Sequence, residues 1–230
     1  MAGAARSSRR ARSASPKASE PAPDLHALAA RRLGRAFFDR DVALVARELI
    51  GCVLVHGPRA LVIVETEAYY GPEDLASHAR FGTTARTAPM FGPPGHAYVY
   101  VCYGAHQMFN VVTQAAGIAS AVLIRGAAPL CGLEDDPTIA RGPGKVGAAL
   151  QVSRQHSGQD LTTDDALLFV ASDPRRSLPH RLADAPPAPE LVVGPRVGVS
   201  YAGPWAAAPL RFAWRGHPSV SRPVPETPWP

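Results

Sequence analysis

The sequence predicts an α+β protein, a single mixed domain built around a β-sheet with flanking helices. Several short segments rich in valine, isoleucine and aromatic residues predict strands. Segments with helical spacing lie beside these strands, and there is no regular strand–helix alternation that would indicate a parallel sheet. Hydrophobic residues make up 46% of the 230 residues, which is enough for a sizeable core.

The predicted elements follow one another along the chain. Asp41 is placed to cap a first helix, which Gly51 ends. Pro72, Glu73 and Asp74 suit the first turn of a second, short helix. Three consecutive strands between residues 98 and 125 predict an antiparallel meander. The expected helices span residues 42–50, 72–80 and 145–152, and the expected strands span residues 52–56, 60–70, 98–103, 108–113, 121–125, 167–170 and 210–214.

Charge and composition divide the chain into a nearly neutral body and a basic N-terminal arm. The net charge is +5, but residues 1–24 hold five basic and two acidic residues and so carry +3 of it. This arm has no periodic apolar face, which predicts disorder, with an organellar transit peptide as the alternative. Proline-rich composition predicts an irregular insert over residues 172–190 and a tail over residues 217–230, which leaves a folded domain over residues 25–216.

Composition excludes two classes of protein. The longest aliphatic run covers residues 60–64, far short of the roughly 20 residues that span a bilayer. Three cysteines without a CxxC pair build neither a disulfide framework nor a zinc ribbon. His78, His96 and His106 lack metal-binding spacing, so we expect hydrogen-bonding roles for them and no metal. The expectation is a reduced, intracellular protein.

Tyrosines concentrate in one part of the sequence, with five of the six inside 35 residues. Tyr98 and Tyr100 share one face of their predicted strand with Cys102, whereas Val99 and Val101 point to the other face. A hydrophobic sheet surface is the simpler interpretation, because aromatic residues are usual in strands. Aliphatic side chains suffice for a core, however, so a separate tyrosine face also fits a surface on which an unstacked nucleobase lies.

Two glutamates interrupt the otherwise apolar strand predicted over residues 60–70. Glu65 and Glu67 are two residues apart, so they share a face with Tyr69 and point away from Val64. One interpretation is an exposed polar face. The other is a site in which a carboxylate among aromatic rings acts as a general base.

A glycine-rich segment, GPGKVG over residues 142–147, precedes the last predicted helix. It formally matches GxGxxG, but no clear strand precedes it and Pro143 fits a dinucleotide-binding turn poorly. A helix N-terminus with free amides and a neighbouring lysine is nevertheless a good site for a phosphate group. The predicted phosphate contacts are Gly142, Gly144 and Lys145.

Several long motifs together resemble one known family. They are ETEAYYGPEDLASHA over residues 65–79, MFGPPGHAYVYVCYGAHQMFNVV over residues 90–112, VLIRGAAP over residues 122–129 and GPGKVGAAL over residues 142–150. In this order they resemble the alkyladenine (methylpurine) DNA glycosylases, and the similarity extends from Leu33 to Trp214. The resemblance implies a single mixed domain around a curved antiparallel β-sheet, without a metal or an organic cofactor.

The resemblance also implies a reaction. Members of the family flip a damaged purine out of duplex DNA and hydrolyse its N-glycosidic bond in base excision repair, which leaves an abasic site. Alkylated and deaminated purines are the implied substrates, and double-stranded DNA with damaged purines is the implied partner. We expect a monofunctional hydrolase that acts as a monomer, without a membrane, in the cytoplasm of a bacterium and in association with the nucleoid.

Roles for individual residues follow from the same resemblance. Glu67 is implied as the general base for a water molecule, and Arg125 as the residue that positions this water. Tyr103 would fill the gap that the flipped nucleotide leaves in the duplex. The implied contacts to the extruded base are Tyr69, His78, Tyr100 and Asn110.

Two other classes of function stay open at this point. A non-catalytic module would recognise extruded purines or abasic DNA without cleavage, but it would not need both Glu67 and Arg125. A hydrolase of free nucleosides would need neither Tyr103 nor the predicted phosphate site over residues 142–145.

Overall fold

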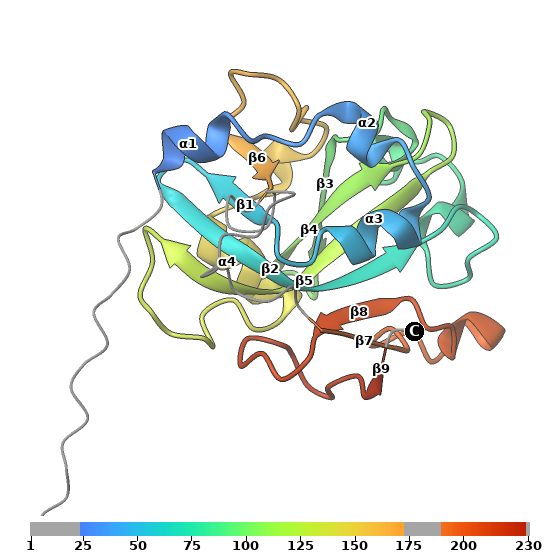
Figure 1. Ribbon diagram of the computed structural model, residues 1–230. Coiled ribbons are helices and arrows are strands. Elements are labelled where there is room, and N and C mark those ends of the chain that lie inside the picture. Colours follow the sequence, from blue (N-terminus) through green and yellow to red (C-terminus); the bar gives the residue numbers. More distant parts are fainter. Residues whose placement is uncertain (1–23, 173–189, 229–230) are drawn as a thin grey trace, which may run out of the picture.

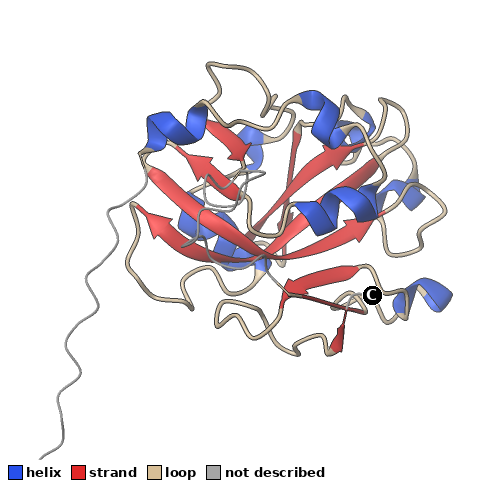
Figure 2. Cartoon of the chain, in the orientation of Figure 1, coloured by secondary structure: helices blue, strands red, loops and turns tan. Residues whose placement is uncertain are grey.

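The computed structural model describes residues 24–172 and 190–228. They form one open antiparallel sheet of nine strands, with short helices around it (Figure 1). Figure 2 shows these helices as separate short pieces beside a strongly twisted sheet. The predicted α+β class is confirmed. Apart from their border positions 24, 172 and 190, the predicted basic arm and the proline-rich insert lie outside the described residues.

All strand pairs are antiparallel, and the strands follow the order β3-β4-β5-β2-β8-β7-β9, with β1 paired to β2 and β6. Their bounds are β1 Val53–His56, β2 Arg59–Tyr69, β3 Ala97–Cys102, β4 His106–Thr113, β5 Ser120–Cys131, β6 Leu168–Ala171, β7 Leu191–Gly194, β8 Arg211–Trp214 and β9 Thr227–Pro228. The α-helices are α1 Leu25–Ala29, α2 Arg35–Phe38, α3 Val42–Glu48 and α4 Pro143–Leu150, and the 3₁₀ turns are η1 His78–Phe81, η2 Ala88–Phe91, η3 Arg154–His156 and η4 Gly203–Ala206. In the part of the chain that the structure describes, no helix is long and apolar enough to cross a membrane.

Most predicted elements are confirmed. Asp41 caps α3, because its carboxylate accepts hydrogen bonds from the main-chain amides of Ala43 and Leu44 at 3.0 and 3.1 Å. The meander is present as β3, β4 and β5. The two N-terminal helices and the strands β7 and β9 are not predicted from the sequence, because they are short and lack a clear periodic pattern.

The helix predicted over residues 72–80 is wrong, since the chain forms turns until η1 begins at His78. The cause is Asp74, whose carboxylate accepts hydrogen bonds from the amides of Tyr70 and Ala76 at 3.1 and 3.0 Å. The same carboxylate forms a buried ion pair with Arg196. A short acidic side chain that binds nearby amides in this way stabilises a turn instead of a helix.

β2 is the centre of the sheet, and it changes partner along one edge. On one side it pairs with β5 along nearly its whole length. On the other side its first residues pair with β1, whereas Glu65–Glu67 pair with β8. Figure 1 accordingly shows β7 and β8 beside the second half of β2. Elements from the last fifth of the chain therefore lie beside the two glutamates.

Alternate side chains of the central strands face two environments. One set packs with α3 and α4 into the main apolar core, and the other set lines a cavity. The strand residues in the core include Leu61, Ile63, Ala68, Val99, Phe109, Val111, Val122 and Ile124. The strand residues in the cavity wall are Glu67, Tyr69, Tyr98, Tyr100, Val101, Cys102, Met108, Asn110, Ala121, Leu123 and Arg125.

A double irregularity interrupts the ladder between β2 and β5. Ile63 pairs with Ala127 and Thr66 pairs with Ile124, while the only pair between them joins Glu65 to Gly126. One residue in each strand, Val64 in β2 and Arg125 in β5, is therefore left without an opposite partner. Such a bulge re-aims the side chains that follow it.

The bulge decides which way the glutamates point. Leu61 and Ile63 lie in the core, so strict alternation would also turn Glu65 and Glu67 toward the core. The shift turns Ala68 to the core instead, and Glu67 then lies in the cavity wall. The expectation that Val64 points away from the glutamates is wrong, because Val64 packs in the same apolar cluster as Ala213, the β8 residue that lies opposite Glu65.

Part of the segment that the sequence sets apart as a proline-rich tail packs into the domain. Ser219, Val220 and Ser221 are buried. Val220 joins the apolar cluster of Val62 and Val64, and β9 pairs with β7. Residues 219–221 therefore lie close to the bulge, and β9 extends the sheet beside β7.

Candidate active site

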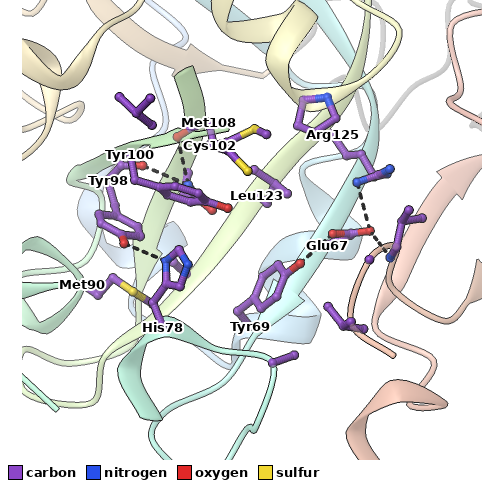
Figure 3. A pocket seen from close by; sticks show the side chains of 18 of the residues that line it. Glu67, Tyr69, His78, Met90, Tyr98, Tyr100, Cys102, Met108, Leu123 and Arg125 are labelled. Carbon is purple, nitrogen blue, oxygen red and sulfur yellow. Dashed lines mark hydrogen bonds and ion pairs between the residues drawn. The ribbon is translucent and has the colours of Figure 1, made fainter. Parts of the chain in front are cut away.

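The cavity has a volume of about 550 Å³ and lies on the side of the strands away from the main core (Figure 3). The strands β2, β3, β4 and β5 supply one side of its wall. The rest comes from η1, η2, residues 197–201, the start of α4 and the loop residues Ala76, Arg86 and Tyr103. The structure brings together in this wall the residues predicted for catalysis, base binding and intercalation, which are Glu67, Arg125, Tyr69, His78, Tyr100, Asn110 and Tyr103.

Glu67 is fully buried and is held by three groups, so the interpretation of an exposed polar face is wrong. The Tyr69 hydroxyl donates to Oε2 at 2.8 Å, and the main-chain amide of Val197 donates to Oε1 at 2.9 Å. Arg125 Nη1 lies 3.5 Å from Oε1 (Figure 3). Burial raises the pKa of the Tyr69 phenol well above its usual value, so this hydroxyl keeps its proton and remains a donor to the carboxylate.

Arg125 lies between the two glutamates. Its Nε is 3.3 Å from Glu65 Oε1 and donates to Ser221 Oγ at 3.1 Å, while Nη1 faces Glu67. Glu65 is bound mainly by Arg211, whose Nε donates to Oε1 at 2.6 Å, and it does not line the cavity. The two carboxylates therefore differ in what they can do, because only Glu67 faces the space that a ligand would occupy.

Aromatic rings form the apolar side of the cavity. The rings of Tyr98 and Tyr100 lie 5.5 Å apart, and the ring of His78 meets that of Tyr100 edge-on at 4.5 Å. The tyrosines also pack with Met90 in a small apolar cluster, so the interpretations of a hydrophobic surface and of a cavity wall both hold in part. The Arg86 guanidinium lies 5.2 Å above the Tyr100 ring, a contact that the sequence analysis missed.

His78 is held in this wall by a hydrogen bond between Nδ1 and the Tyr98 hydroxyl at 2.9 Å. Desolvation, and to a smaller extent Arg86 and Arg80, lower the pKa of His78 to about 4. The imidazole is therefore neutral near pH 7 and does not repel a positively charged ring in the cavity.

Asn110 is buried in β4 with its amide facing the same space. Its Nδ2 donates to the main-chain oxygens of Tyr98 and Met108 at 3.0 and 3.2 Å. These two bonds occupy the amide nitrogen and leave the oxygen as the remaining polar atom of the side chain. The side chain is thereby prepared to accept a hydrogen bond from a ligand.

Tyr103 stands at the tip of the turn between β3 and β4, at the mouth of the cavity, and its side chain is 93% exposed. Its φ of 49° is uncommon for a residue with a side chain, and Gly104 follows at φ 72°. A large aromatic ring held in water on a strained turn gains no stability from burial, which points to a role toward a partner.

The predicted phosphate contacts lie beside this hairpin. Gly142, at φ 114°, precedes α4 without a side-chain cap, which leaves the first amides of the helix available. The Lys145 ammonium donates to the main-chain oxygen of Thr138 at 3.2 Å. Gly144 also has a packing role, because a Cβ there would lie 2.9 Å from the ring of His106.

A buried ion pair between Arg196 and Asp74 supports the position of the Glu67 carboxylate. This pair is not predicted from the sequence. The Arg196 guanidinium binds Asp74 and the main-chain oxygen of Ala68, and it lies 4.6 Å from the centre of the Tyr69 ring. Arg196 thereby fixes the segment whose next residue, Val197, donates to Glu67. The signal available in the sequence was a charged residue in an apolar segment, PRVGV, late in the chain.

Among residues 24–172 and 190–228, no group of three or more histidine, cysteine, aspartate or glutamate side chains is arranged to hold a metal ion. The site combines aromatic rings on one side with a buried carboxylate and an arginine on the other. Such a combination can stack a flat ring and bring the bond beside that ring to a carboxylate.

Comparisons with known proteins agree with this description. A sequence profile of the family described as methylpurine-DNA glycosylase matches residues 36–218. A relative from Anaeromyxobacter dehalogenans strain 2CP-1 is 52% identical over 199 residues, which cover 84% of this chain and 87% of the relative. A relative from Myxococcus xanthus strain DK1622 is 44% identical, with 84% and 95% covered. Both relatives carry the name "Putative 3-methyladenine DNA glycosylase".

The chain belongs to the methylpurine-DNA glycosylase family. It is a DNA glycosylase of the 3-methyladenine or methylpurine type, a hydrolase of N-glycosyl bonds that acts on damaged DNA in DNA repair. The resemblance found in the sequence is confirmed.

Proposed function

We propose that the protein flips a damaged purine out of duplex DNA, holds it in the cavity and hydrolyses its N-glycosidic bond with water. The observation that carries this proposal is the shared cavity wall, with Glu67 and Arg125 on one side and the rings of Tyr98 and Tyr100 on the other. A base inside the duplex cannot reach these groups, so its nucleotide has to leave the stack.

Glu67 acts as the general base in this proposal, and Arg125 positions the water. The bonds from Tyr69 and Val197 are short, whereas the distance from Arg125 Nη1 to Glu67 Oε1 is 3.5 Å. The contact between Arg125 and Glu67 is therefore the weakest of the three. A water molecule can bridge the guanidinium and the carboxylate there. The carboxylate then takes the proton of the water and stabilises the positive charge that develops on the sugar.

Alkylated purines suit this mechanism best. A purine that is positively charged by alkylation is already a good leaving group and needs little help from an acid. Stacking on tyrosine faces favours a cationic ring by about 0.5–2 kcal/mol, and the neutral His78 does not oppose it. We extend the proposal to deaminated purines such as hypoxanthine, because damaged or mispaired bases also cost less to unstack.

Duplexes that each carry one lesion test this proposal. We expect release of free 3-methyladenine and 7-methylguanine from DNA, release of hypoxanthine or ethenoadenine, and no release from undamaged DNA or from free nucleosides. Binding without release would favour a recognition module, and release from nucleosides would favour a nucleoside hydrolase.

The same mixtures test whether the enzyme leaves an intact abasic site. Lyase activity needs an amine at the sugar, and Lys17 and Lys145 are the only lysines. Lys145 donates to a main-chain oxygen beside the proposed phosphate site, and it does not line the cavity. Borohydride should therefore trap no protein–DNA adduct. An adduct that disappears in Lys145→Ala would contradict the water mechanism.

Tyr103 is the proposed wedge that fills the gap in the duplex, because its exposed ring stands at the mouth of the cavity. Replacing Tyr103 by alanine should shift the flipping equilibrium toward the stacked base by at least about tenfold, since unstacking costs a few kcal/mol per step. The fluorescence of 2-aminopurine next to the lesion measures this shift. Phe81→Ala, which removes another exposed ring outside the cavity wall, is the matched control. An unchanged signal in Tyr103→Ala would contradict the wedge.

We also propose that the protein acts as a monomer in the bacterial cytoplasm, in association with the nucleoid. The sequence has three cysteines and no CxxC pair, in keeping with a reducing compartment. Light scattering and the imaging of a fluorescent fusion check the two parts of this proposal, and a dimer or an exported protein would contradict it.

A further inference from the structure

Ser221 lies in a buried stretch that is anchored on both sides. Before it, Val220 packs in the apolar cluster with Val62 and Val64. After it, β9 forms a ladder with β7. The main-chain oxygen of Ser219 lies 3.0 Å from the position that a Cβ on Gly126 would occupy, so the stretch also fits closely against the bulge. Ser221 is therefore held in place independently of its own side chain.

Each polar group of Ser221 contacts the charged cluster around Glu65. Its amide donates to Glu65 Oε2 at 2.7 Å, and its main-chain oxygen accepts from Arg211 Nη2 at 3.0 Å. Its hydroxyl donates to Glu65 Oε1 at 3.0 Å and accepts from Arg125 Nε at 3.1 Å. The hydroxyl is thus the group that links this stretch to Arg125.

The orientation of Arg125 depends on what holds its Nε. A guanidinium is planar, so a fixed direction for Nε–H also fixes the direction of Nη1. The Nε lies 3.3 Å from Glu65 and the Nη1 lies 3.5 Å from Glu67, so neither ion pair is tight. The Ser221 hydroxyl supplies the shorter contact. Without it, the guanidinium is free to turn fully toward Glu65 and leave Glu67.

Family membership does not assign this role, because the family match ends at residue 218. We infer that Ser221 is a positioning residue, which holds Arg125 through Nε so that Nη1 faces Glu67. The inference rests on the proposed roles of Glu67 and Arg125, and it makes a stretch beyond the matched region part of the active site.

Ser221→Ala removes the hydroxyl and keeps both main-chain contacts. We expect single-turnover excision of a methylated purine to slow by about tenfold, with the affinity for lesion DNA unchanged within about twofold. Ser221→Cys, whose thiol is a weak hydrogen-bonding group of similar size, should be intermediate. Ser219→Ala is the matched control, because the buried Ser219 hydroxyl has no hydrogen-bond partner among the described residues. Its excision rate should equal that of the wild type.

A double-mutant cycle distinguishes positioning from a general structural effect. Arg125→Lys keeps a positive charge but lacks the Nε–H that Ser221 binds. In the Arg125→Lys background, Ser221→Ala should therefore cause no further loss of rate. Two outcomes would overturn the inference: Ser221→Ala excising as fast as Ser219→Ala, or the tenfold loss persisting undiminished in the Arg125→Lys background. Failure of the proposed function would give a different result. Either the wild-type protein would release no purine, or the Glu67→Gln variant would still release it.

Discussion

Replacing Glu67 by glutamine is expected to slow single-turnover excision of a methylated purine by at least about 10²-fold. The amide has nearly the shape of the carboxylate, so the affinity for lesion DNA should stay within several-fold of the wild type. What the variant lacks is a base for the water and a negative charge opposite the cationic sugar. Single-turnover kinetics with enzyme in excess measure the chemical step alone.

The control for this variant is Glu190→Gln, which removes the same charge from an exposed side chain paired with Arg215. Its excision rate should equal that of the wild type. Far-ultraviolet circular dichroism of both variants establishes that they are folded. Excision by Glu67→Gln at a near-normal rate would show that another group activates the water.

Asp74→Ala is expected to lower the free energy of unfolding by about 3–5 kcal/mol. The substitution leaves the Arg196 guanidinium buried without its carboxylate, and both side chains of this pair are fully buried. It also removes the acceptor for the amides of Tyr70 and Ala76. Urea denaturation near pH 7 measures the loss, and a change below about 1 kcal/mol would contradict this account.

Two comparisons separate burial from charge. The double variant Asp74→Ala/Arg196→Met removes both charges and should recover part of the lost stability, because no unpaired charge remains buried. Glu190→Ala breaks the exposed pair with Arg215 and should cost at most about 1 kcal/mol, as surface pairs do. Equal losses of unfolding free energy in Asp74→Ala and in Glu190→Ala would show that the buried pair stabilises the fold no more than the exposed pair does.

The sequence predicted those parts of the site that depend on local pattern. Alternation along one strand placed Tyr98 and Tyr100 on a common face, and both line the cavity. The meander followed from three short apolar segments, and with it the neighbourhood of Asn110 and Arg125 was predictable. These features follow from the alternation of side chains along a strand and from the short connections between neighbouring strands.

What could not be predicted depends on contacts between distant parts of the chain. The bulge at Val64 and Arg125 leaves no mark in a single sequence, although it decides which face carries Glu67. Local pattern predicts Asp74 in the first turn of a helix, whereas its partner in the structure, Arg196, lies 122 residues later. The proline-rich composition around Ser221 suggested a tail, because composition cannot reveal that a segment without regular structure is buried.

The change of partner along β2 has a consequence for how the protein is made. Three of the residues that enclose the two glutamates, Val197, Arg211 and Ser221, are synthesised after the strands of the cavity wall. While the chain leaves the ribosome, the edge of β2 at Glu65–Glu67 stays open until β8 arrives. An incomplete chain can therefore form the aromatic wall but not the enclosed carboxylate. A nascent or truncated glycosylase should consequently be unable to create abasic sites in the genome that the complete enzyme protects.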